Sequence, residues 1–81
     1  MKSILSLSDG NLVYRTIGKR HPETIFFCHS LGANQSLWDR QIEQLSDNYH
    51  IVSCDLRGHG ESDIFTTPYS IEILAKDILT L

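Results

Sequence analysis

The sequence has few cysteines, few prolines and few basic residues, and these low numbers exclude several classes of protein. Its 81 residues include two cysteines and two prolines, and seven Lys and Arg stand against ten Asp and Glu. The net charge is −3 and the only adjacent basic residues are Lys19-Arg20, so the sequence has no basic patch that would bind nucleic acid or an anionic membrane. No C-x-x-C or H-x-x-x-H spacing supports a metal site, and Gly58-x-Gly60 is too short for a dinucleotide fingerprint. We therefore expect no metal, no cofactor and no nucleic-acid partner.

The sequence also lacks a targeting signal. Residues 1–9 contain one lysine but no continuous apolar stretch and no small-residue cleavage site, so they do not form a secretory signal. No apolar run is long enough to cross a membrane. We expect a cytoplasmic protein, in which Cys28 and Cys54 are small core residues at the ends of buried strands; a disulfide or a metal pair is the alternative.

Hydrophobic periodicity predicts one small domain over residues 1–81, built from four strands and two helices. The predicted strands are residues 3–7, 12–17, 24–28 and 51–54, and the predicted helices are residues 36–46 and the segment after Ser70. Asp9-Gly10-Asn11 predicts a hairpin turn, because Gly and Asn tolerate positive φ. The first two strands should therefore be antiparallel.

The third predicted strand defines the fold class. Residues 24–28 are apolar on both faces, which is typical of a central parallel strand. Together with the helix and strand that follow, they form a strand-helix-strand unit, which implies a right-handed parallel crossover. The prediction is an α/β fold with a mixed sheet, an antiparallel hairpin plus this parallel unit, and flanking helices.

Both predicted helices have start signals. Ser36 followed by Asp39 resembles a capping box, and Ser70 is a suitable N-cap, with Tyr69 and Leu74 placed to form a hydrophobic staple. The apolar stripe of the last helix is still running at Leu81, with no capping residue after it. We interpret this ending as a chain cut short.

Two segments carry possible chemistry, each at the carboxyl end of a predicted parallel strand, where open α/β sheets bind ligands. In residues 27–34, Gly32 lets the backbone turn sharply and expose peptide N–H groups, which an oxyanion requires. In residues 55–62, Gly58 and Gly60 flank a histidine, and Arg57 stands close enough to Asp55 for a local ion pair. We interpret the second segment as a structural loop at the mouth of a pocket.

The order of these motifs resembles the N-terminal portion of α/β-hydrolases, and most of all the 3-oxoadipate enol-lactonase group. The resemblance covers nearly the whole chain and is clearest from Ile25 onward. The matching residues are His29, Ser30, Leu31, Gly32, Trp38, Asp39, Gln41, Asp55, Arg57, Gly58, His59, Gly60, Ser62, Tyr69 and Ser70.

The resemblance implies a role for each segment. The backbone N–H of Leu31 would be one oxyanion-hole donor, and His29, Ser30 and Gly32 would lie at the substrate pocket, with Ser30 standing where many relatives have Gly. The structural loop would comprise Asp55, Arg57, Gly58, His59, Gly60 and Ser62. The catalytic histidine of such enzymes comes later in the chain, so His59 would not serve as one.

The resemblance also shows what the sequence lacks. The family's G-x-S-x-G nucleophile elbow follows the helix that begins near Ser70, and this motif is absent from the 81 residues, as are the later acid and histidine. A small ester or lactone would be the substrate of the complete enzyme, with no cofactor, while this chain alone should show negligible turnover.

Several alternatives remain open. Ser30 or Ser62 could serve as a nucleophile in an incomplete elbow, whereas a Cys28-His29 dyad fails because neighbours on a strand face opposite sides. The chain could be a non-catalytic, self-associating module, because residues 24–28 would leave one sheet edge open without the nucleophile strand. The same fold could also carry dehalogenase, epoxide hydrolase or C–C hydrolase chemistry.

Overall fold

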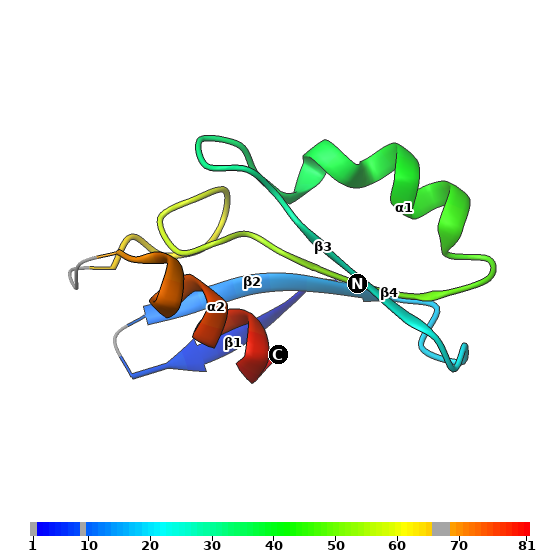
Figure 1. Cartoon of the computed structure of the whole chain (residues 1–81), viewed down its shortest axis with the longest axis horizontal. Helices are drawn as coiled ribbons and strands as arrows, with labels where there is room; N and C mark the ends of the chain where they lie inside the picture. The colour runs from blue at the N-terminus through cyan, green and yellow to red at the C-terminus, as the bar shows by residue number, and fades with distance from the viewer. Residues whose placement is uncertain (1, 9, 66–68) are drawn as a thin grey trace.

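A computed structural model describes residues 2–8, 10–65 and 69–81 (Figure 1). The predicted strands are all present, with ends that differ by two residues or fewer. They are β1 (Lys2–Leu7), β2 (Gly10–Ile17), β3 (Thr24–Cys28) and β4 (His50–Cys54); the helical elements are the 3-10 helix η1 (Gln35–Trp38), α1 (Asp39–Leu45) and α2 (Ile71–Thr80). No helix among the described residues is long and apolar enough to cross a membrane.

The four strands form one mixed sheet in the order β1-β2-β4-β3. β1 pairs with β2 and β2 pairs with β4, both antiparallel, while β3 and β4 run parallel on either side of η1 and α1 in the sequence. The predicted combination of an antiparallel hairpin with a parallel strand-helix-strand unit is confirmed.

Among the described strands, β3 lies at the edge of the sheet, as expected for a chain without the nucleophile strand, and not at the centre that its apolar run alone suggested. It pairs with β4 from Thr24 opposite His50 to Cys28 opposite Cys54, and no other described strand pairs with its second edge. Its apolar run reflects partial cover on both faces, since the middle of the strand, Ile25 to Phe27, is half-buried. Burial on both faces gives the same sequence pattern in an edge strand as in a central one.

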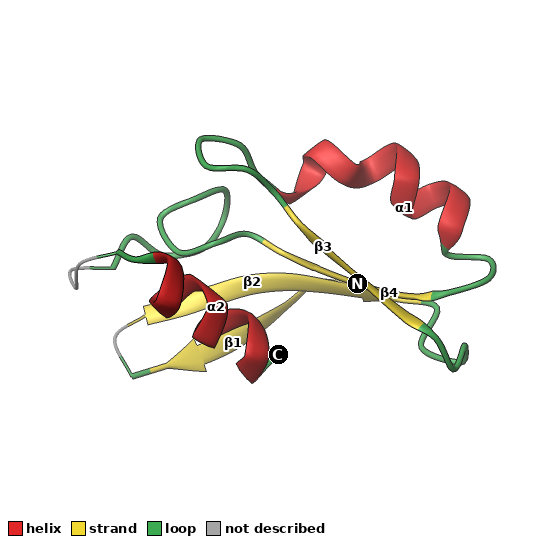
Figure 2. Ribbon diagram, viewed as in Figure 1, coloured by secondary structure: helices red, strands yellow, loops and turns green. Residues whose placement is uncertain are grey.

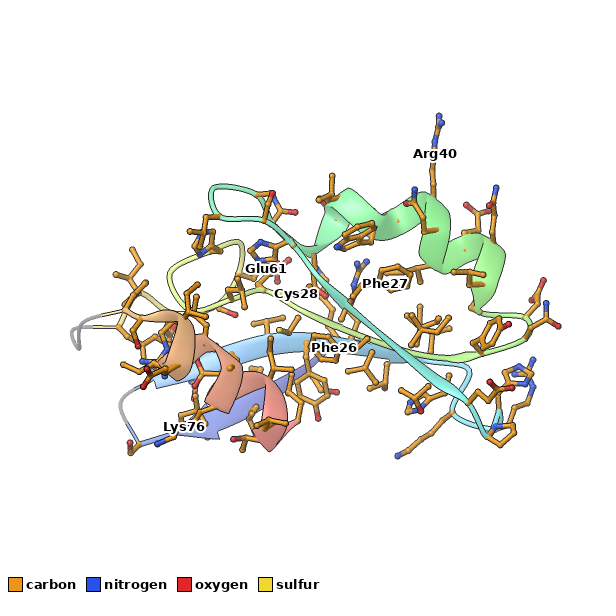
Figure 3. All side chains as sticks on the ribbon, viewed as in Figure 1. Phe26, Phe27, Cys28, Arg40, Glu61 and Lys76 are labelled. Atoms are coloured by element: carbon orange, nitrogen blue, oxygen red, sulfur yellow. The ribbon has the colours of Figure 1, made fainter. Side chains whose placement is uncertain are left out.

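Two neighbouring residues of β3 show how the faces are covered. Phe27 packs on Trp38 at the start of the helical segment, with ring centroids 5.1 Å apart. Phe26 packs on the opposite face, against the cluster that Leu74 of α2 forms with two residues of β4 and its following loop, Cys54 and Leu56 (Figure 3). Because successive strand residues point to opposite faces, the two helical segments lie on opposite sides of the sheet.

The first helical segment begins earlier than predicted. Asn34, not Ser36, is the N-cap: its Oδ1 accepts a hydrogen bond of 3.0 Å from the backbone N–H of Ser36. Ser36 lies inside the 3-10 turn, and its hydroxyl also donates to Asn34 Oδ1. Asn and Ser are comparable N-caps, so the sequence alone did not decide between them.

The hairpin glycine has a different role from the predicted one. Gly10 lies in β2 opposite Leu7 and is not among the glycines with positive φ, while Asp9 lies outside the described residues. A Cβ on Gly10 would come within 2.9 Å of the Phe65 ring. The position therefore needs a small residue because an aromatic ring packs on the backbone.

The last helix starts as predicted. Ser70 is the N-cap of α2, and its Oγ accepts a hydrogen bond of 3.2 Å from the N–H of Ile73. Tyr69 is engaged elsewhere, because its hydroxyl accepts from the N–H of Phe65 at 3.0 Å, and the staple with Leu74 stays a prediction. The apolar stripe is only partly covered, since Leu74 is buried while Ile71 is 74% exposed.

Candidate active-site loops

The two segments singled out from the sequence meet at one end of the sheet. The loop after β3, residues 29–34, and the loop after β4, residues 55–65, extend beyond the same end of the strands (Figure 2). Because β3 and β4 are parallel neighbours, their carboxyl ends lie side by side. We call these segments the β3 loop and the β4 loop.

A tight turn forms the tip of the β3 loop. The carbonyl of Ser30 accepts a hydrogen bond of 3.1 Å from the N–H of Ala33, and Gly32 has φ of +83° at the position where a type II turn requires it. The N–H of Gly32 is occupied, because it donates to Nε2 of His59 at 3.0 Å. The N–H of Leu31 has no acceptor among the described residues, which leaves it available to a ligand.

His29 anchors the start of the β3 loop. Its side chain is 3% exposed, Nδ1 donates to the carbonyl of Ser30 at 2.8 Å, and Nε2 accepts from the N–H of Leu56 at 3.0 Å. Both ring nitrogens are therefore bonded to backbone. His29 lies at the predicted pocket with its polar atoms turned into the protein.

Asp55 organises the start of the β4 loop. Its two carboxylate oxygens accept hydrogen bonds from the backbone N–H groups of Gln35 at 2.8 Å and Glu61 at 3.0 Å. Burial alone would raise the pKa of Asp55, but these hydrogen bonds, the Gln35 side chain and the nearby His29 together lower it. Gly60, with φ of +51°, passes so close that an added Cβ would overlap the carboxylate.

Ser62 joins the β4 loop to β2. Its hydroxyl donates to the carbonyl of Asp55 at 2.6 Å and accepts from the N–H of Val13 at 2.9 Å. The residue is 8% exposed and its proton is held by a carbonyl, so it has neither the access nor the general base that a nucleophile needs. Ser30 is exposed, but no described histidine nitrogen contacts its hydroxyl.

Arg57 joins the β4 loop to α2. Its guanidinium donates to the carboxylate of Asp77 at 2.7 and 2.8 Å and lies 4.0 Å from the centre of the Phe65 ring. The sequence predicted Asp55 as the partner, but the ion pair that the structure shows is with Asp77. A signal was present, because Asp77 lies three residues after Leu74, on the buried face of α2, where an apolar residue is expected.

Gln35 is a site residue that the sequence did not reveal. It is 5% exposed, and its Oε1 accepts from Arg15 Nε at 2.9 Å and Ser53 Oγ at 2.8 Å. Its own N–H reaches Asp55. These partners come from β2, β4 and the β4 loop, so no local sequence pattern predicts the contacts of Gln35.

The two cysteines lie opposite each other in β3 and β4 but differ in environment. Both are free; Cys54 is buried, as predicted, whereas Cys28 is exposed, so its interpretation as a core residue is wrong. Burial raises the pKa of Cys54 to about 12 and also raises that of Cys28. A raised pKa opposes thiolate formation, and His29 Nδ1 bonds to Ser30, so a Cys28-His29 dyad gains no support.

An apolar groove runs from the end of β3 to α2. Its volume is about 300 Å³, and it is lined by Cys28, His29, Ser30, Leu31, Leu56, Ile71, Leu74, Ala75 and Ile78. Gly32 is not among the lining residues, so the groove gathers two of the three predicted pocket residues, His29 and Ser30, together with the predicted donor Leu31. In the part of the chain that the structure describes, no group of three potential metal ligands occurs.

This arrangement, a mixed sheet with an exposed N–H at the turn after β3 and a braced loop after β4, matches a known fold. The sequence profile of the alpha/beta hydrolase fold matches residues 23–81, and the chain belongs to that family. The resemblance inferred from the two motifs is thereby confirmed.

Enol-lactonases are among the similar proteins and solved structures. The chain is 38% identical over 80 residues to 3-oxoadipate enol-lactonase 2 of Acinetobacter baylyi, covering 99% of this chain and 30% of that protein. The structure resembles an enol-lactonase from Burkholderia xenovorans LB400, with a TM-score of 0.81, 34% identity, and coverage of 95% and 30%. A hydrolase from Pseudomonas aeruginosa PA01 gives a TM-score of 0.85 at 32% identity, covering 98% and 30%. The chain spans about 30% of the length of these relatives.

Proposed function

We propose that this chain supplies half of an oxyanion hole to an α/β-hydrolase that cleaves a small carboxylic ester or lactone. The donor is the backbone N–H of Leu31. In the complete enzyme a serine would attack the acyl carbon, and this N–H would stabilise the negative charge that develops on the carbonyl oxygen. The similarity to enol-lactonases supports the ester or lactone class of substrate.

One observation carries the proposal: the N–H of Leu31 has no acceptor among the described residues, whereas the two N–H groups that follow it are bonded. Gly32 gives its N–H to His59, and Ala33 gives its N–H to Ser30. A preorganised donor of this kind stabilises charge without having to reorient during the reaction. The apolar lining of the adjacent groove strengthens the effect, because a low dielectric raises the value of each hydrogen bond.

The remaining predicted site residues have supporting roles in this proposal. Asp55, Arg57 and Ser62 tie the β4 loop to η1, α2 and β2, and His59 ties it to the β3 loop. None of these side chains is proposed to touch the substrate. No cofactor takes part, and a cytoplasmic location remains a prediction from the sequence.

A segment exchange tests the proposal. Residues 1–81 replace the matching 80-residue segment of the Acinetobacter enol-lactonase 2, giving what we call the exchange chimera. We expect it to hydrolyse the enol-lactone and to retain that activity in Ser30→Ala. A folded chimera without lactonase activity would contradict the proposal.

The 81-residue chain provides the matching control. Without an activated nucleophile it should not turn over p-nitrophenyl acetate. Turnover by this chain that is lost in Ser30→Ala would make Ser30 the nucleophile and overturn the assignment.

Self-association is a second candidate function. In the described part of the chain, β3 leaves one edge unpaired, and the apolar groove lies beside its carboxyl end. An unpaired edge invites pairing with another chain. Sedimentation of the chain over a range of concentrations tests this candidate.

A further inference from the structure

Two histidines connect the β3 and β4 loops in a reciprocal way. His29 of the β3 loop accepts a hydrogen bond of 3.0 Å from the N–H of Leu56 in the β4 loop. His59 of the β4 loop accepts a hydrogen bond of 3.0 Å from the N–H of Gly32 in the β3 loop. Each loop therefore contributes one imidazole acceptor and one backbone donor, and the two rings lie in contact with centroids 5.1 Å apart.

The partners of each ring assign its tautomer. Nδ1 of His59 faces the carbonyl of Arg57 at 3.0 Å, and Nδ1 of His29 faces the carbonyl of Ser30 at 2.8 Å. A carbonyl only accepts, so Nδ1 carries the proton in both rings. Nε2 then has a free lone pair in both rings, as its backbone N–H partner requires.

We propose that His59 is a positioning residue for the oxyanion donor. By accepting the N–H of Gly32 it fixes the orientation of the turn and leaves Leu31 N–H as the free donor at its tip. The inference rests on the proposed role of Leu31 as a donor. His59 itself does not touch the substrate.

The turn needs this contact because packing does not hold it. The side chain of Leu31 is 69% exposed, and a Cβ added to Gly32 would meet no atom within 4 Å. Besides the Ala33–Ser30 hydrogen bond within the turn, the contact that fixes Gly32 is the one to His59.

His59 is itself held firmly. Its N–H donates to the carbonyl of Leu56 at 2.9 Å, and its carbonyl accepts from the N–H of Ser62 at 3.0 Å. The hydrogen bond from Nδ1 to Arg57 then sets the direction of the ring. A ring fixed in this way transmits the rigidity of the β4 loop to the more exposed turn.

Trans-hydrogen-bond NMR tests the contact in the unmodified 81-residue chain at neutral pH. An N–H···N hydrogen bond gives a scalar coupling between its two ¹⁵N nuclei. We expect a coupling between Gly32 N and His59 Nε2, with ring ¹⁵N shifts of the Nδ1–H tautomer. Absence of that coupling, or a proton on Nε2 of His59, would overturn the proposal, whether or not Leu56 couples to His29.

Two variants test the consequence for the turn. His59→Leu removes the acceptor and should speed amide exchange at Gly32 about tenfold, the value of one hydrogen bond, while Leu56 keeps its protection. His59→Gln retains an oxygen acceptor near the position of Nε2 and should restore the protection. Equal exchange at Gly32 in the two variants would overturn the proposal.

The exchange chimera links positioning to catalysis. His59→Leu should lower kcat about tenfold with KM unchanged, and His59→Gln should recover most of that loss. His21→Leu, at the opposite end of β3, is the matched control and should leave kcat unchanged. A drop in the control equal to that in His59→Leu, or no rescue by Gln, would contradict positioning.

The two proposals fail separately. If the Gly32–His59 coupling is present but removal of the Leu31 N–H leaves kcat unchanged, the turn is braced as inferred but Leu31 is not the donor. If the N–H of Leu31 is required but the coupling is absent, the donor stands and its positioning by His59 is wrong.

Discussion

The guanidinium of Arg57 and the carboxylate of Asp77 form a bidentate ion pair in which both side chains are more than nine-tenths buried. The pair joins the β4 loop to α2; among the described residues, apolar contacts and Tyr69 also connect these segments. Removing one member of a buried pair leaves an unpaired charge in the interior. This lowers the free energy of unfolding far more than the loss of an exposed pair does.

We therefore predict that Asp77→Ala lowers the free energy of unfolding by about 3–5 kcal/mol. The control is Glu61→Ala, which breaks the exposed pair with Lys2 and should cost less than about 1 kcal/mol. Urea denaturation of both variants checks the difference. Equal losses would show that burial does not determine the contribution of the Arg57–Asp77 pair.

The environment of Asp55 predicts that part of the free energy of unfolding is lost at acidic pH. Its pKa is lowered in the folded chain, so the folded state favours the charged carboxylate. The stabilisation is present above the pKa of the unfolded chain and is lost as the pH falls below about 5 and through the folded pKa. Asp55→Asn should be less stable at neutral pH and should lose less stability on acidification. Parallel unfolding curves for the two proteins at every pH would contradict this.

Substitution by Ala should destabilise the chain to different extents at Gly32 and at Gly60. Both have positive φ, so Ala at either position pays a backbone cost of about 1–2 kcal/mol. Only at Gly60 does the new Cβ meet other atoms, the carboxylate of Asp55. We expect Gly60→Ala to be clearly less stable than Gly32→Ala in thermal unfolding. Similar melting temperatures would mean that the β4 loop moves to make room for the methyl group.

Two variants of α2 test whether copies of the chain associate through the β3 edge and the adjacent groove. Ile71 is 74% exposed and lines the groove, whereas Leu79 on the same helix is 85% exposed and does not line it. If copies associate there, Ile71→Lys should shift sedimentation toward the monomer and Leu79→Lys should not. A monomer at all concentrations, or equal effects of the two variants, would exclude this surface.

Much of this structure could be predicted from the sequence, and the exceptions have physical causes. Strand boundaries and the Ser70 cap depend on local patterns, and the structure reproduces them. The edge position of β3 could be expected from the resemblance but not from its side-chain pattern, because that pattern records which faces are covered and not which edges are paired.

The contacts within the site depend on residues that are distant in the chain. The motifs correctly indicated that the two loops after β3 and β4 matter, and the free N–H of Leu31 lies in the predicted turn. Gln35 and Asp77 were missed because their partners lie 18 to 20 residues away. The hydrogen bond between Gly32 and His59 joins residues 27 positions apart, and hydrophobic periodicity does not predict it either.

Replacement of the Leu31 amide by a backbone ester in the exchange chimera tests the oxyanion assignment most directly, because it removes the N–H and keeps the side chain. Cys28 and Cys54 flank the segment and allow assembly by ligation without a substitution. An ester at Asn34, whose N–H also lacks an acceptor among the described residues, is the matched control. We predict that the ester at Leu31 lowers kcat for the lactone by about 10²–10³ while the control stays near the all-amide chimera. An unchanged kcat for the Leu31 ester would contradict the assignment.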